Sequence, residues 1–187
     1  GDILHDQAPF WGVKGIHYHQ NLKAGDNTVN FQLAQELFAL IRKQGAYDPD
    51  AWLETYISCM LTPGWHQDTY LEEYHRGFFT RYSQGKEPRK CGISDEHIGG
   101  LAQVPALLAA LPDHPDPKSL VKQHVALTHR HSNVLRAADC LTRLHLRLRE
   151  GVTIRDAIMT EAGDWFSSRK AAKREYRPDL EIIGSVF

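Results

Sequence analysis

A short polar turn, Gly25-Asp26-Asn27-Thr28, runs directly into a segment with helical periodicity. Three of its side chains carry an oxygen, and two kinds of chemistry use such oxygens at the start of a helix. They cap the unpaired N–H groups of the helix, or they coordinate a hard cation such as Mg²⁺. Because Asp, Asn and Thr are common at helix starts, the spacing alone leaves both interpretations open.

Histidines suggest a second kind of chemistry. His17 and His19 alternate along a loop-like segment, and imidazole nitrogens suit Zn²⁺, Ni²⁺ or Cu²⁺. Such a site needs a third ligand, for which His5 and Asp26 are the nearest candidates. A His-rich transition-metal protein is therefore one alternative for this chain.

Composition limits the classes of protein that need to be considered. The 187 residues suffice for one domain with a substantial core. Lys and Arg number 22 against 23 acidic residues, so the net charge of −1 gives no field that would attract nucleic acid or an anionic membrane. No apolar run approaches the ~20 residues of a membrane span, and no leader pattern is visible. Three separated cysteines without a C-x-x-C motif fit free thiols, so we expect a cytoplasmic protein.

The elements that position these residues are expected to be helices. Apolar residues recur at helical spacing along most of the chain, and strand alternation never exceeds four residues. We therefore predict an all-α fold with no sheet of three or more strands. Thr69-x-x-Glu72 forms a capping-box pattern, and Pro105 is expected in an early helical turn. The predicted helices cover residues 28–43, 49–61, 69–85, 101–111, 118–127, 132–149 and 153–166.

The helix phases also predict a core. Large apolar side chains on one face of each helix are expected to be mostly buried. These are Trp52, Tyr56, Leu71, Tyr74, Phe78, Leu107, Leu127 and Leu144. Acidic side chains near the start of the third helix, Asp68, Glu72 and Glu73, are explained by the helix dipole.

Three motifs follow one another in a recognisable order: GDNT (25–28), DEHIGGLAQVPALL (95–108) and LTH (127–129). This order resembles the ADP-ribosylglycohydrolase family, whose members are all-α bundles with a magnesium pair in a central cleft. The segments WGVKGIHYHQNLKAGDNT, HQDTYLEEYHRGFFTRYSQGK and CGISDEHIGGL are more similar to the branch that contains the J-crystallins and selenoprotein J. The resemblance covers nearly the whole chain.

The resemblance implies a magnesium site at Asp26, Asn27 and Thr28. The first metal motif of the family is Thr-Asp-Asp-Thr, onto which GDNT falls. Asp26 and Thr28 match, whereas Gly25 replaces the first Thr and Asn27 replaces the second Asp. Loss of one hydroxyl and of one negative charge weakens a site for a hard cation.

The resemblance also implies a substrate loop. The Asn-Gly loop of the family falls on residues 97–100, so that His97 replaces the Asn and Ala102 replaces a following Arg. Gly99 and Gly100 allow close approach of the backbone to a ligand. His97, Gly99 and Gly100 are thus the predicted substrate-binding residues, and they are expected to face GDNT across a cleft. His129, in the LTH motif, is expected to form hydrogen bonds between helices.

The implied function is metal-assisted hydrolysis of an ADP-ribosyl N- or O-glycosidic bond, with Mg²⁺ as cofactor and an ADP-ribosylated substrate or ADP-ribose-like ligand as partner. The second metal motif of the family is absent from residues 1–187, so we expect a single domain that lacks an N-terminal helix and a C-terminal third. No general base is assigned. A non-catalytic, crystallin-like structural or ligand-binding role is the alternative.

Overall fold

The computed structural model describes residues 22–171, with side chains described as far as residue 163. Within this part of the chain the regular structure is helical and no β-strand forms, which confirms the all-α class. Two short 3-10 helices, η2 and η3, cover Pro88–Lys90 and Ile98–Leu101. The α-helices are α1 (Val29–Gln44), α2 (Pro49–Leu61), α3 (Glu73–Ser83), α4 (Val104–Ala110), α5 (Pro117–Ala126), α6 (Ser132–Arg149) and α7 (Ile154–Ala171).

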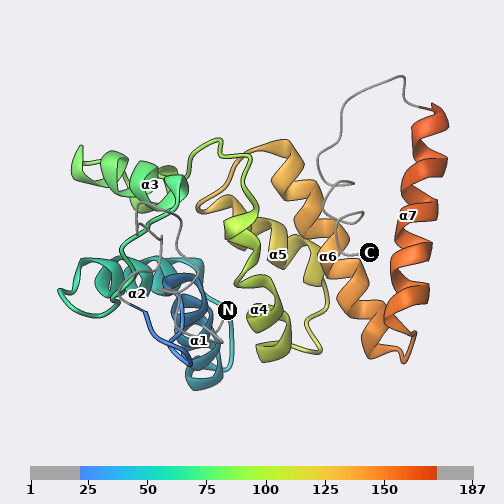
Figure 1. Ribbon diagram of the computed structural model, residues 1–187, viewed down its shortest axis with the longest axis horizontal. Coiled ribbons are helices and arrows are strands. Elements are labelled where there is room, and N and C mark those ends of the chain that lie inside the picture. The colour runs from blue at the N-terminus through green and yellow to red at the C-terminus, as the bar shows by residue number, and fades with distance from the viewer. Residues whose placement is uncertain (1–21, 172–187) are drawn as a thin grey trace.

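The helices follow one another across the molecule, as Figure 1 shows. α1 lies against α2 and α4, α4 also contacts α5 and α6, and α6 packs against both α5 and α7. α7 therefore forms one edge of the described structure. No helix among residues 22–171 is long and apolar enough to cross a membrane.

Local signals explain where several helices begin and end. The side chain of Asp48 accepts a hydrogen bond from the backbone N–H of Asp50, and Pro49 occupies the first helical position of α2. Gly45 ends α1 in the left-handed conformation, and its N–H donates to the carbonyl of Ile41 at 2.8 Å. Thr153 and Asp156 form the capping pair at the start of α7. These ends agree with the sequence prediction.

The third helix begins later than predicted. The capping-box pattern placed its start at Thr69, whereas α3 begins at Glu73, with Glu72 as the cap residue. Glu72 makes no capping hydrogen bond with its side chain. Its carboxylate instead accepts a hydrogen bond from Asn30 of α1, so a tertiary contact takes the place of the local one. The predicted capping box is therefore wrong.

The predicted core is largely confirmed. Six of the eight predicted residues are buried, namely Trp52, Tyr56, Tyr74, Phe78, Leu107 and Leu127. Leu71 is half-buried against the core, and Leu144 is half-buried because it lines a cavity. The helix phases read from the periodicity are therefore correct for this set.

A buried carboxylate connects α7 to α6. The side chain of Glu161 is fully buried and accepts hydrogen bonds from Arg143 Nε at 2.6 Å and Arg147 Nε at 2.9 Å. Burial raises the pKa of Glu161, but the two arginines more than offset this, and its pKa lies below the ordinary value. Glu161 and its two arginine partners are thus part of the contact between α6 and α7.

We expect Glu161→Gln to lower the free energy of unfolding by about 1–3 kcal/mol, because it leaves two half-buried guanidinium groups without their carboxylate. Urea unfolding measures the loss, and hydrogen exchange should show it first in α7. Asp113→Asn is the matched control, since Asp113 forms an exposed ion pair with Arg149 and should matter little. Equal effects of the two substitutions would contradict this role for Glu161.

Candidate functional site

The GDNT turn is closed by its own residues. Gly25 has a φ of 90°, and the carboxylate of Asp26 accepts the backbone N–H of Lys23 at 2.8 Å. Thr28 is the cap residue of α1 but makes no capping hydrogen bond with its side chain. The N–H of Val29 instead donates to Asp68 Oδ2 at 2.9 Å, from 39 residues further along the chain. Asp68, expected in the first turn of the third helix, thus caps α1.

The residues predicted to hold magnesium do not form a ligand set on their own. Asp26 is exposed and its carboxylate closes the turn, and Asn27 contributes only a neutral amide. Among the described residues, no group of three or more His, Cys, Asp or Glu side chains is arranged to hold a metal ion. The magnesium site at Asp26, Asn27 and Thr28 therefore stays a prediction. His5, His17 and His19, the alternative metal ligands, lie outside the described residues.

The first turn of α1 instead contributes a hydrogen-bonded asparagine. Asn30 Nδ2 donates to Glu72 Oε1 at 2.8 Å, while its Oδ1 accepts from Tyr74 at 2.6 Å and lies 3.0 Å from His75 Nε2. Because an amide oxygen only accepts, His75 Nε2 carries the proton, and His75 Nδ1 accepts from the Tyr56 hydroxyl at 2.7 Å. Burial lowers the pKa of His75 to about 3, so the ring is neutral. The network fixes the orientation of the Asn30 amide and thereby of Glu72.

The predicted substrate loop packs closely on the side chains of Glu72 and His129. A Cβ atom at Gly99 would lie 1.6 Å from Glu72 Oε2, and one at Gly100 would lie 2.3 Å from His129 Nδ1. A side chain at position 99 would displace the carboxylate of Glu72, and one at position 100 would meet the buried ring of His129. The start of α1 and the loop at 97–100 therefore contact the same carboxylate, that of Glu72, although Asp26, Asn27 and Thr28 themselves do not line the cavity beside it.

His97 is paired with Asp95. The backbone N–H of His97 donates to Asp95 Oδ1 at 2.9 Å, and its ring Nδ1 lies 2.7 Å from the same oxygen. The Asp95 side chain is 2% exposed, whereas the His97 side chain is 76% exposed. A buried carboxylate thus orients an exposed imidazole.

His129 is held by the backbone beside this loop. Ile93 N–H donates to the Thr128 carbonyl at 2.9 Å, and Arg130 N–H donates to the Ile93 carbonyl at 2.8 Å. The ring is fully buried, and its centroid lies 4.3 Å from that of Tyr74. Its Nδ1 pairs with the neighbouring Thr128 hydroxyl at 2.9 Å. His129 joins the helices by packing, rather than by the interhelix hydrogen bond expected from the sequence.

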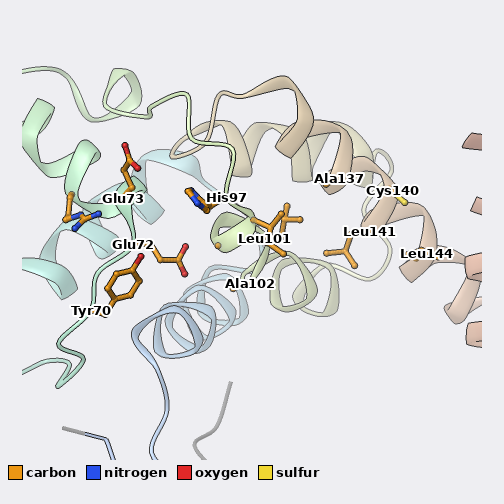
Figure 2. Close-up of a pocket in the computed structure, with 13 residues that line it drawn as sticks. Tyr70, Glu72, Glu73, His97, Leu101, Ala102, Ala137, Cys140, Leu141 and Leu144 are labelled. Carbon is orange, nitrogen blue, oxygen red and sulfur yellow. The ribbon is translucent and has the colours of Figure 1, made fainter. Parts of the chain in front are cut away.

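Glu72, His97 and Gly99 line a cavity of about 740 Å³. Figure 2 shows that the carboxylate of Glu72 points towards Leu101, whereas that of Glu73 points away. One end of the cavity is polar and is lined by Tyr70, Glu72, Glu73, Arg76 and His97. The other end is apolar and is lined by Leu101, Ala102, Ala137, Cys140, Leu141 and Leu144.

Asn30, Glu72 and Asp95 were not predicted as site residues. Asn30 and Glu72 meet across 42 residues of sequence, and no local pattern signals their contact. The spacing of Asp95 two residues before His97 is a usable signal for an oriented histidine, and it lies within the motif at 95–108. Comparisons with models of protein families, with curated proteins and with solved structures give no match for this chain. The chemistry of the cavity is therefore the observation that bears on function.

Proposed function

We propose that this protein binds an ADP-ribose-like nucleoside sugar in the cavity and, as the resemblance implies, hydrolyses the glycosidic bond of an ADP-ribosyl group. One observation carries the proposal. Two of the segments that carry the resemblance meet at the polar end of the cavity, where Glu72 lies against Gly99, and Glu72 also accepts a hydrogen bond from Asn30, two residues beyond GDNT.

The chemistry of the cavity suits such a ligand. A fixed carboxylate accepts hydrogen bonds from sugar hydroxyls, and Arg76 and His97 supply donors for phosphate oxygens at the same end. The apolar end, between Leu101 and Leu144, suits the face of a nucleobase. The volume of about 740 Å³ lies within the range of small-molecule sites.

A binding protein without catalysis is the second candidate. The observation that favours it is the engagement of the Asp26 carboxylate with the backbone of Lys23. The residue that matches the first carboxylate of the family's metal motif thereby has a structural role. Release of free ADP-ribose from an ADP-ribosylated peptide, measured with and without added Mg²⁺, distinguishes hydrolysis from binding alone.

We expect Glu72→Gln to weaken ADP-ribose binding at least about tenfold, because hydrogen bonds to a charged group contribute about 1.5–3 kcal/mol. Isothermal titration calorimetry on the whole chain measures the affinity. Glu73→Gln is the matched control: Glu73 lines the same end of the cavity, but its carboxylate points away from Leu101 and from the carboxylate of Glu72, so its loss should change the affinity much less. The proposed function fails if the unmodified protein does not bind ADP-ribose, and the role of Glu72 fails if both substitutions have equal effects.

A further inference from the structure

The geometry of His97 is that of a proton donor with a fixed orientation. Because the Asp95 carboxylate only accepts hydrogen bonds, Nδ1 of His97 carries the proton of the 2.7 Å contact. A second hydrogen bond, from the backbone N–H of His97 to the same oxygen, restrains the ring relative to the chain. The ring is otherwise exposed at the cavity, which leaves Nε2 for a ligand.

Nearby charges favour the protonated ring. Hydrogen bonding to Asp95 and its charge raise the pKa of His97, and Glu73 and Glu72 at the start of α3 act in the same direction. Burial raises the pKa of Asp95, but the hydrogen bonds from His97 more than offset this, so that Asp95 stays ionised. Arg76, Tyr70 and Cys140 are titratable groups that line the same cavity, and burial keeps the nearby His129 neutral by lowering its pKa to about 4.

A carboxylate faces the same cavity. Glu72 is held by Asn30 through one oxygen, while the other lies against Gly99, two residues from His97. Figure 2 shows both side chains at the polar end of the cavity. In inverting glycosidases an acid protonates the leaving group and a carboxylate assists the attacking water. The two side chains are of these types.

We propose that His97 is the general acid of this site, that Asp95 is its positioning residue, and that Glu72 receives a proton from the attacking water. This inference rests on the proposed hydrolase function. In the step, the water oxygen forms a bond to the anomeric carbon, and the bond from that carbon to the leaving oxygen breaks. The leaving oxygen keeps the electron pair and takes the proton from His97 Nε2. One proton of the water passes to Glu72, and the other stays on the new hydroxyl group at the anomeric carbon.

Two leaving groups test this role of His97. An ADP-ribosyl serine peptide needs a proton on its leaving oxygen, whereas the p-nitrophenyl glycoside of ADP-ribose releases a stable phenolate without one. General acid catalysis contributes at least about 100-fold. We expect His97→Gln to lower the hydrolysis of the serine peptide by at least this factor, and that of the p-nitrophenyl glycoside by much less. Equal losses for both substrates would overturn the inference.

Asp95→Asn tests the positioning role. In the unmodified protein, activity on the serine peptide should fall at high pH as His97 loses its proton. In the variant, this high-pH limb of the activity profile should move to lower pH, because the charge of Asp95 that holds the proton is gone. The p-nitrophenyl activity of the variant reports whether its site remains intact. An unmoved limb, or no hydrolysis of either glycoside by the unmodified protein, would overturn the inference. ADP-ribose binding by calorimetry decides the binding part of the proposed function separately.

Discussion

Acidification from about pH 6.5 to about pH 4 is expected to remove several kcal/mol of stability from this protein. Three histidines are almost completely buried. Burial lowers the pKa of His75 and His124 to about 3 and that of His129 to about 4. In the unfolded chain each of these groups titrates near its ordinary pKa of about 6.5.

The direction in which stability changes with pH follows from proton binding. Below about pH 6.5 the unfolded chain binds protons on these three side chains and the folded protein does not, so the unfolded state gains stability as the pH falls. Each histidine contributes up to about 1.4 kcal/mol per pH unit until its folded pKa is reached. At neutral pH these histidines are unprotonated in both states, so none of this stability has been lost. Urea unfolding at a series of pH values measures the slope.

His124→Gln isolates one of these contributions. His124 lies away from the candidate site and contacts Tyr47 and Gln103. The variant should lose stability at neutral pH, but its stability should fall less steeply with acid, by about the share of one histidine. His97→Gln should leave the slope between pH 6.5 and pH 4 unchanged, because the raised pKa of His97 makes its contribution to stability change only above about pH 6.5. A slope of His124→Gln equal to that of the unmodified protein would contradict this account.

Gly92→Ala is expected to cost about 3 kcal/mol of stability, the sum of overpacking and of weakened backbone hydrogen bonds. A Cβ atom at this position would lie 2.6 Å from the carbonyl oxygen of Leu127 and 3.1 Å from that of Ala126. These are backbone atoms, so relief requires separation of the two segments. The separation would break the hydrogen bonds between Ile93 and residues 128–130 that position His129.

Gly163→Ala is the matched control for this substitution. Gly163 lies within α7, and among the described residues no atom outside its own helical turns and chain neighbours lies within 4 Å of the position of an added Cβ. The same chemical change should therefore stabilise the protein by up to about 1 kcal/mol through helix propensity. Denaturant unfolding of both variants gives the two free energies. A Gly92→Ala protein as stable as the unmodified chain would show that the two segments do not approach so closely.

Much of the fold follows from local patterns. Both ends of α2 and of α6 fall where the sequence predicts them, since Asp48-Pro49 starts α2 and the apolar periodicity continues through α6. The start of α3 does not, because Glu72 forms its hydrogen bond with Asn30 rather than with the residues just before it. The specific bundle of the ADP-ribosylglycohydrolases stays a prediction.

The candidate site was only partly foreseeable. His97, Gly99 and Gly100 were predicted, and the structure brings His97 and Gly99 to the cavity and Gly100 against His129. Asn30 was not predicted, although it lies only two residues beyond the predicted ligand Thr28. The motif resemblance singled out residues 25–28, but not Asn30, whose side chain contacts Glu72.

The sequence by itself determined which segments are helical and which of their faces are buried, because caps and periodicity act between residues a few positions apart. Only the tertiary structure decided which buried polar groups meet. Asp68 caps α1 across 39 residues, and Asn30 reaches His75 across 45. Such contacts depend on how helices pack against each other, to within the length of a hydrogen bond. No pattern along the chain specifies that geometry.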